Sequence, residues 1–296
     1  MIDPVIISFN IGTVTIALRW YGVLVMTGVL VATWITSVEF KRRNENPDHI
    51  WDALVWMIPA GMLGARLWYV ANATLGGSRY YIENPTQILN TTQGGLHFYG
   101  GLLFGAIALI LYTRKYKVDL WLFLDSVAPT VLIGQAVARP ANFINQELYG
   151  PPTTLPWGIK IDAANRLAPW NDIITFPVET TGFHPTFAYE ILWNLLAAEI
   201  LLFLARQYED KIKPGVIFYA WLVLSGIGRV IIEIWRPDQP RIPGTDFSFT
   251  RLVAVLMAII GTVLMLDKLR VIRIPFIPEG ADTYTLSKSV VNSSEE

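Results

Sequence analysis

The 296-residue chain contains no cysteine, only three histidines and little charge. Without cysteine it can form no disulfide, thiolate metal site, iron–sulfur cluster or cysteine nucleophile. His49, His97 and His184 are scattered, so we expect no metal site and no cofactor. Charged residues make up 16%, whereas about 25% is usual in soluble proteins. The net charge of −1 provides no basic surface for nucleic acid, and none is expected as a partner.

Apolar sequence dominates instead, with 53% hydrophobic residues and a mean hydropathy of +0.41. At ~150 residues per domain the length alone would suggest two soluble domains. The long hydrophobic runs suit a lipid bilayer better, because about 20 helical residues cross its hydrocarbon core. The alternation of a membrane β-barrel is missing, so we predict an all-α integral membrane protein with seven transmembrane helices. The expected spans are 20–38, 53–70, 96–112, 120–137, 186–204, 215–235 and 252–266, the last of which Phe247 and Phe249 could extend.

Basic residues indicate the orientation of a membrane protein, because they are enriched in cytoplasmic loops. Twelve of the 23 follow the first, third, fifth and seventh spans: Lys41, Arg42, Arg43, Arg114, Lys115, Lys117, Arg206, Lys211, Lys213, Lys268, Arg270 and Arg273. Seven spans place these four clusters on one side. The sequence therefore predicts an outer N-terminus and a cytoplasmic C-terminus.

We expect one transmembrane domain, 1–282, followed by a polar cytoplasmic tail, 283–296, that should be disordered. The domain includes two long outer segments, the arm 71–95 and the head segment 139–185. Seven prolines in the head segment favour an ordered, non-helical structure. No internal repeat is visible, which argues against the many transporters built from repeats.

Several charged residues lie in or beside the expected spans, where each costs roughly 2.5–3.5 kcal/mol to insert. Arg229, Glu233 and Arg236 have spacings of i, i+4 and i+7, within about 60° on one helix face. They could bind an anion, or form an ion pair that only holds helices together. Arg139 ends the fourth span and adds a second cation. Arg66, in the second span, could be functional or could extend its guanidinium to the membrane surface.

Two further segments place polar groups at the outer ends of spans. Gly94-Gly95 and Gly100-Gly101 bracket His97 and Tyr99 before the third span. If the helix begins at Leu96, His97 and Tyr99 lie about 200° apart, so only one can face a given cavity. His184 and Pro185 open the fifth span, and Glu190 follows about one turn later. Glu190 could be functional, or could pair with an arginine of a neighbouring span.

At these residues the chain resembles the prolipoprotein diacylglyceryl transferase family. The resemblance rests on motifs in family order, from Arg19 to Asp238. They are Arg19-Trp20-Tyr21-Gly22, Gly64-Ala65-Arg66-Leu67, the two glycine pairs, Arg139-Pro140-Ala141-Asn142-Phe143-Ile144-Asn145-Gln146-Glu147-Leu148-Tyr149-Gly150, Thr154-Leu155-Pro156-Trp157-Gly158, His184-Pro185-Thr186 with Tyr189-Glu190, and Gly228-Arg229 with Glu233, Arg236 and Asp238. One motif alone would be weak, whereas the ordered set is highly specific.

The resemblance implies an enzyme of the bacterial inner membrane whose active site faces the outer leaflet. Such an enzyme moves the diacylglyceryl group of phosphatidylglycerol to the lipobox cysteine thiol of a prolipoprotein signal peptide, and releases glycerol-1-phosphate without a cofactor. The implied catalytic residues are Arg139, Arg229, Tyr99 and Glu233. The implied substrate-binding residues are Tyr21, Arg66, Asn142, Asn145, Glu147, Gly150, Glu190 and Arg236.

This chain departs from the family pattern at several positions. Pro140 should disfavour a helical conformation at Arg139 and kink the backbone there. Tyr99 lies where a histidine is frequent, and His97 is offset by two residues. Thr250 and Arg251 replace an expected Gly-Gln pair, and further replacements are Ala138, Phe187 and Ala188. The group that deprotonates the thiol stays open between Tyr99, His97 and the field of the arginines.

Two other functions are compatible with the same residues. A lipid transporter or scaffold could use the arginines to bind headgroups without chemistry, and would be expected to show internal symmetry. A non-catalytic relative could have lost activity at Tyr99, and would be expected to have lost several motifs together.

Overall fold

The computed structural model describes residues 2–12, 14–91, 94–236, 238–245, 247–277 and 280–286. Most of the expected tail 283–296 lies outside these residues. The chain forms two compact units. Unit one is Met1–Trp34 with Leu124–Thr283, and unit two is Ile35–Phe123 with Tyr284–Glu296. Helices α1 (Trp20–Arg42) and α5 (Leu120–Ala138) each pass from one unit into the other.

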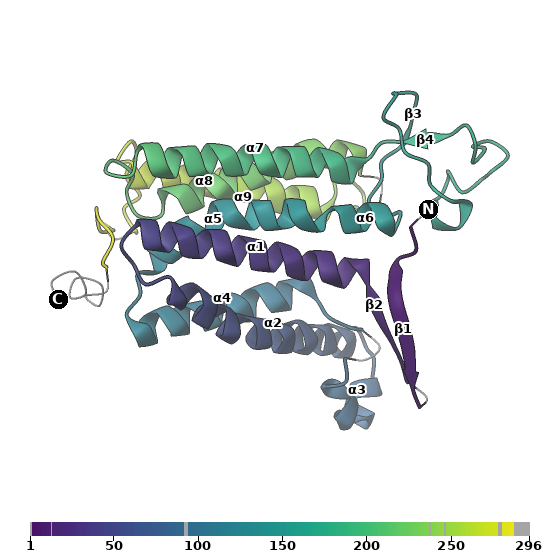
Figure 1. Cartoon of the computed structure of the whole chain (residues 1–296), viewed down its shortest axis with the longest axis horizontal. Coiled ribbons are helices and arrows are strands. Elements are labelled where there is room, and N and C mark those ends of the chain that lie inside the picture. The colour runs from purple at the N-terminus through teal and green to yellow at the C-terminus, as the bar shows by residue number, and fades with distance from the viewer. Residues whose placement is uncertain are drawn as a thin grey trace. The chain divides into compact units, whose positions relative to one another are not determined.

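Within the described residues, six helices are long and apolar enough to cross a membrane. They correspond to six of the seven expected spans, and several extend beyond the predicted ends (Figure 1). They are α1, α2 (Asp48–Leu75), α5 continued by α6 (Pro140–Ile144), α7 (Thr186–Gln207), α8 (Val216–Ile232) with the 3-10 turn η3 (Glu233–Trp235), and α9 (Phe249–Lys268). The start of α9 confirms that Phe249 extends the last span.

The third expected span is the helix α4 (Phe98–Tyr116), which is not among these six. Its apolar centre is flanked by Tyr99 and two glycines at one end and by Arg114 and Lys115 at the other. These ends shorten its hydrophobic length, so its crossing of a membrane stays a prediction. In unit two α4 packs closely on α2. Their backbones are so close that a Cβ at Gly64 would lie 2.5 Å from the carbonyl oxygen of Gly100.

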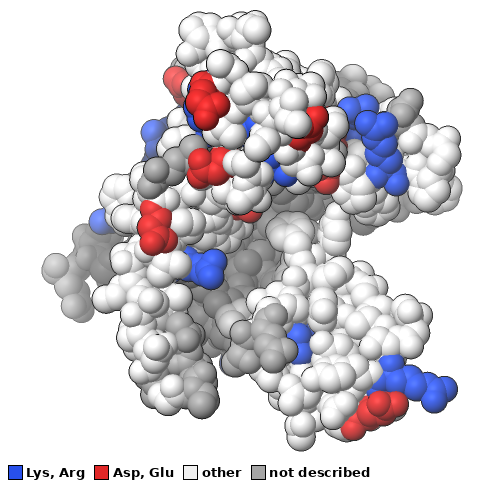
Figure 2. All heavy atoms as spheres, turned by 90° about the vertical axis from the view of Figure 1, so that its right-hand side faces the viewer, with Lys and Arg blue, Asp and Glu red and all other residues white. Residues whose placement is uncertain are grey.

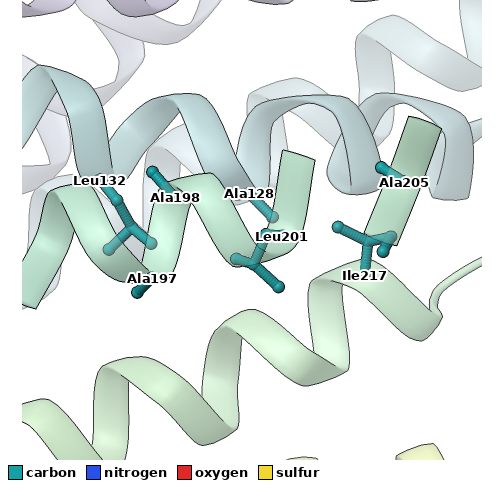
Figure 3. Close-up of a cluster of buried hydrophobic side chains, with 7 residues drawn as sticks. All are labelled: Ala128, Leu132, Ala197, Ala198, Leu201, Ala205 and Ile217. Atoms are coloured by element: carbon teal, nitrogen blue, oxygen red, sulfur yellow. The ribbon is translucent and has the colours of Figure 1, made fainter. Parts of the chain in front are cut away.

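The core of unit one lies between α5, α7 and α8 (Figure 3). Small side chains predominate there, and they let the helix backbones approach closely. Such close packing stabilises helix contacts in lipid, where no hydrophobic effect drives helices together. The cluster consists of Ala128, Leu132, Ala197, Ala198, Leu201, Ala205 and Ile217. Elsewhere in this unit Gly28 of α1 meets Gly134 of α5, where an added Cβ would lie 2.4 Å from a carbonyl oxygen. The helices that carry the polar residues are therefore held rigidly together.

Asp125 is a fully buried carboxylate inside α5 that sequence analysis did not single out. It accepts hydrogen bonds from the backbone amides of Gly215 and Phe218, the latter at 2.7 Å. The first amides of a helix have no partner within the helix and need one from outside. Asp125 therefore caps the start of α8 from a neighbouring helix and fixes the position of α8.

We expect Asp125→Ala to destabilise the protein by roughly 2–6 kcal/mol, because two backbone amides would lose their acceptors at ~1–3 kcal/mol each. Thermal unfolding of the purified protein in detergent measures the effect. Asp125→Asn is the matched control, since it keeps one acceptor and should lose about half as much. Equal stability of Asp125→Ala and the parent protein would contradict the capping role.

Two short antiparallel strand pairs accompany the helices. Strands β1 (Val5–Ile11) and β2 (Val14–Arg19) form a hairpin that leads directly into α1. Sequence analysis did not predict this hairpin. Strands β3 (Pro152–Thr153) and β4 (Gly182–Phe183) pair within the head segment 139–185, whose small core contains Tyr149, Ile161 and Phe183. The head segment thus has a small hydrophobic core of its own.

Unit two carries the arm 71–95, which includes the short helices α3 (Tyr80–Glu83) and η1 (Pro85–Ile88).

Charges on the surface are sparse. On the face shown in Figure 2, acidic and basic side chains are interspersed and neither sign forms a large patch. This distribution agrees with a net charge near zero.

Candidate active site

Arg139 lies between α5 and α6, at the start of the sequence motif 139–150. Its backbone is helical, with φ −59° and ψ −31°, and its amide donates to the carbonyl of Gln135. The prediction that Pro140 disfavours a helical conformation at Arg139 is therefore wrong. Pro140 occupies the first position of α6, where a missing amide hydrogen costs little. The helix consequently continues past Arg139 with only a local change in hydrogen bonding.

The guanidinium of Arg139 is held by two side chains. It donates to Oδ1 of Asn142 at 3.3 Å and forms an ion pair with Glu190 of α7. Glu190 therefore pairs with an arginine of a neighbouring helix, one of the two alternatives that the sequence left open. The Nε of Arg139 is buried and has no hydrogen-bond partner among the described residues.

The motif loop after α6 is organised around Glu147. This carboxylate accepts from Nδ2 of Asn142 at 2.9 Å and from Nδ2 of Asn145 at 3.2 Å. Asn142 is thereby oriented so that its oxygen faces Arg139. Gly150 ends the loop in a confined position, because a Cβ there would lie 2.8 Å from the carbonyl oxygen of Trp235.

Arg229 lies in the last turn of α8 and pairs with Glu233 at 3.1 Å. Glu233 is buried, and its second oxygen accepts from the hydroxyl of Ser248 at 2.6 Å. The Ser248 hydroxyl also caps α9 by accepting from the amide of Arg251. Sequence analysis missed Ser248, since nothing in its neighbourhood marks a partner of Glu233. The Nε of Arg229 is also buried and lacks a hydrogen-bond partner among the described residues.

Arg236 follows the 3-10 turn η3 and does not belong to the α-helix that carries Arg229. The α-helix ends at Ile232, so the α-helical spacing from which the shared face was predicted does not extend to Arg236. Arg236 forms a bidentate ion pair with Asp238, in which its Nε donates to Oδ1 at 2.7 Å and a terminal nitrogen donates to Oδ2 at 2.8 Å. Burial opposes ionisation of Asp238, but the hydrogen bonds and charge of Arg236 outweigh it, and the pKa of Asp238 lies below its usual value.

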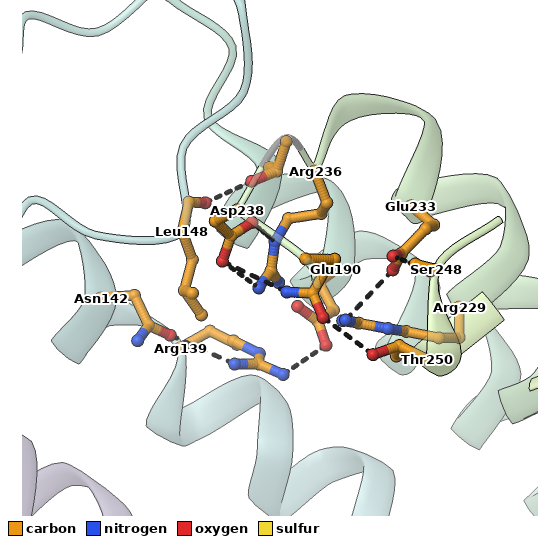
Figure 4. A network of polar contacts seen from close by, with 12 residues as sticks. Arg139, Asn142, Leu148, Glu190, Arg229, Glu233, Arg236, Asp238, Ser248 and Thr250 are labelled. Atoms are coloured by element: carbon orange, nitrogen blue, oxygen red, sulfur yellow. Dashed lines mark hydrogen bonds and ion pairs between the residues drawn. The ribbon is translucent and has the colours of Figure 1, made fainter. Parts of the chain in front are cut away.

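Glu190 lies among the three arginines of the site. Besides its contact with Arg139, it interacts electrostatically with Arg229 and Arg236. Figure 4 shows these side chains converging from α5, α7, α8 and the start of α9. We call this set the arginine–carboxylate network: Arg139, Asn142, Glu190, Arg229, Glu233, Arg236, Asp238 and Ser248. Most of the predicted site residues thus belong to it or contact it directly.

A second polar group lies at the start of α7. The Trp157 indole donates to the Tyr189 hydroxyl at 2.9 Å, and that hydroxyl lies 2.9 Å from Nδ1 of His184. The indole can only donate, so the Tyr189 hydroxyl accepts from Trp157, and the tautomer of His184 sets which partner donates in the second contact. Burial lowers the pKa of His184 below its usual value, which favours the neutral ring.

Three predicted residues have no described contact with the network, and two of them belong to the other unit. Tyr21 is half-exposed in the first turn of α1, and Arg66 and Tyr99 belong to unit two. Arg66 is buried and donates to the carbonyls of Gln87, Ile88, Gly94 and Gly95. It also contacts the rings of Tyr69 and Tyr81. These contacts fasten the arm to α2.

The structure corrects the argument about His97 and Tyr99. Helix α4 begins at Phe98, and His97 precedes it with an extended backbone, φ −102° and ψ 126°. The helical spacing that separated the two side chains by about 200° therefore does not apply. The His97 ring lies 5.7 Å from that of Tyr69, whereas Tyr99 in the first turn is 46% exposed.

The fold and the network together define a class, a multi-pass α-helical membrane protein with a buried cluster of arginines and carboxylates. The family model for prolipoprotein diacylglyceryl transferase matches residues 6–266. The phosphatidylglycerol–prolipoprotein diacylglyceryl transferase of Chloroflexus aggregans is 37% identical over 244 residues, 80% of this chain and 78% of the relative. The protein of that name from Enterococcus faecalis is 33% identical over 255 residues, 86% of this chain and 88% of the relative. The chain therefore belongs to the prolipoprotein diacylglyceryl transferase family.

Proposed function

We propose that this protein transfers the diacylglyceryl group of phosphatidylglycerol to the lipobox cysteine of prolipoproteins. Its family membership and the names of its relatives support this reaction. One feature of the site carries the assignment to the network. Arg139 and Arg229 are each held by a carboxylate, and each keeps a buried Nε without a hydrogen-bond partner among the described residues. An unsatisfied buried donor costs about 1–3 kcal/mol, which a phosphate oxygen would recover.

The chemistry needs a site of this kind. The cysteine sulfur attacks the glyceryl carbon that bears the phosphate, so that a carbon–sulfur bond forms while the carbon–oxygen bond breaks. The bonding electrons leave on the phosphate oxygen, and the singly charged phosphodiester becomes a doubly charged monoester. Two fixed cations stabilise the added charge as it develops. Arginine suits this role, because its planar fork matches phosphate oxygens.

The other residues of the network position these cations. Glu233 and Ser248 orient Arg229, and Asn142 and Glu190 orient Arg139. Glu147 fixes the amides of Asn142 and Asn145, which can then hold headgroup hydroxyls. Gly150 and Tyr21 would complete the lipid site. The thiol, with a free pKa of ~8.5, must also lose its proton, for which we propose Tyr99, with the arginine field lowering the thiol's pKa.

Complementation tests this function. The gene should restore growth to a bacterium depleted of its own transferase, and a reporter lipoprotein should gain the mass of a diacylglyceryl group. A lipid transporter would leave the reporter mass unchanged. A non-catalytic relative would do the same, although Arg139, Asn142, Glu147, Gly150, Arg229 and Glu233 are all retained.

We further propose that α4 crosses the membrane as the seventh helix, that the N-terminus is outside, and that the site opens toward the outer leaflet of the inner membrane. Two ion pairs with the same carboxylate support the proposal that two of the basic clusters lie on one side of the membrane. Lys213, after α7, and Arg270, after α9, both pair with Asp282. The basic clusters that follow α7 and α9 would then both lie in the cytoplasm.

Cysteine labelling checks this topology against a background free of cysteine. Single cysteines at Lys41, Arg114, Lys211 and Arg270 should resist an impermeant thiol reagent in cells with a permeabilised outer barrier. A cysteine at Ser78 should react. Labelling at position 41 in intact inner membranes would reverse the orientation.

A further inference from the structure

A cavity of about 250 Å³ in unit one borders the arginine–carboxylate network. The head segment, the connection between α8 and α9, and the first turn of α9 all contribute to its wall. Three arginines line it, Arg236, Arg241 and Arg251, against a single carboxylate, Glu233. The reaction steps proposed above make no use of Arg241 or Arg251.

Most charges around the cavity are already matched. Arg236 is paired with Asp238, and Glu233 is held by Arg229 and Ser248. Arg241 is also engaged in a hydrogen bond, ion pair or other contact with a neighbouring group. The Arg251 guanidinium lies over the ring of Phe247 at 5.4 Å, and its Nε is buried with no hydrogen-bond partner among the described residues. Among the described residues that line this cavity, Arg251 therefore offers a buried donor that is unused.

The position of Arg251 adds to the local positive charge. It lies in the first turn of α9, where the helix dipole favours anions and disfavours cations by about 0.3–1 kcal/mol. A bound anion would interact favourably with Arg251 and with the dipole together.

We propose that this cavity binds a phosphate monoester, the glycerol phosphate that the transfer reaction releases. The proposal rests on the proposed function. The cavity volume is about eight times the ~30 Å³ that a water molecule occupies in the liquid, enough for a small phosphate ester but not for a diacyl lipid. Glu233 and Arg236 belong both to the cavity wall and to the network. The leaving group can thus move a short distance from the reacting centre and be held by Arg251 apart from the next lipid.

Equilibrium binding without turnover tests the proposal. Purified protein in micelles saturated with phosphatidylglycerol, with no acceptor peptide present, is titrated with glycerol-1-phosphate. The lipid occupies the network, so any further binding reports a separate site. The parent protein should bind glycerol-1-phosphate, and Arg251→Gln should weaken that binding about tenfold, which corresponds to about 1.4 kcal/mol. Arg251→Lys should weaken it less, because it keeps the charge.

Arg79→Gln is the matched control, since Arg79 is exposed and lies in unit two. It should bind glycerol-1-phosphate as the parent protein does. Absence of binding in lipid-saturated micelles would overturn the proposal, as would equally tight binding of inorganic phosphate. If Arg251→Gln instead weakens binding of phosphatidylglycerol itself, the cavity holds a lipid headgroup and the product assignment is wrong. Failure of the proposed function would appear separately, as a lack of transfer once acceptor peptide is added.

Discussion

Replacing Arg139 or Arg229 with lysine should lower kcat/KM by about 10²–10³-fold, the usual loss when one donor to a developing anion is removed. Lysine keeps the charge but loses the planar fork and the Nε–H. At position 139 a lysine cannot reach Asn142, Glu190 and a substrate oxygen with the same geometry. Mass spectrometry of a lipobox peptide, after reaction with phosphatidylglycerol and purified enzyme, measures the rate.

Arg79→Lys is the control, because this exposed arginine has no place in the network. The thermal stability of each variant should stay close to that of the parent protein, which separates lost chemistry from lost folding. Near-normal turnover in both Arg139→Lys and Arg229→Lys would show that the ion pairs only hold helices together, the alternative that the sequence left open.

The second large effect is expected at Tyr99. We predict that Tyr99→Phe is impaired by about 10²-fold or more, the usual contribution of a proton-transferring side chain. Tyr99→His should stay active, and His97→Ala should have a mild effect. This assignment depends on the position of Tyr99 in the glycine-bracketed motif. It no longer depends on helical spacing, since His97 lies outside α4.

The same peptide assay, run across a range of pH, distinguishes the two residues. Tyr99→His should shift the pH dependence toward neutral values, because the usual pKa of histidine is ~6.5 and that of tyrosine is ~10. A fully active Tyr99→Phe together with an inactive His97→Ala would assign the proton transfer to His97 instead.

The sequence by itself determined the class of fold and the family. Long apolar runs identify membrane helices, because the bilayer replaces water as the solvent and leaves helices as the main way to satisfy the backbone. Six of the seven expected spans were found as long apolar helices, and the ordered motifs led to the family to which the chain belongs. The N-terminal hairpin was not predicted.

Which charges meet was decided only by the tertiary structure. The sequence marked Arg139 and Glu190 as unusual, but they lie on different helices and pair only because α5 packs beside α7. Spacing did predict the pair of Arg229 and Glu233, which are one turn apart. Its premise of a continuous α-helix did not hold as far as Arg236, since α8 ends at Ile232, or at His97, since α4 begins one residue later. Ser248 and Asp125 act on helix ends that are distant in the sequence. A helical pattern specifies which side chains share a face, whereas partners across helices depend on how those helices pack.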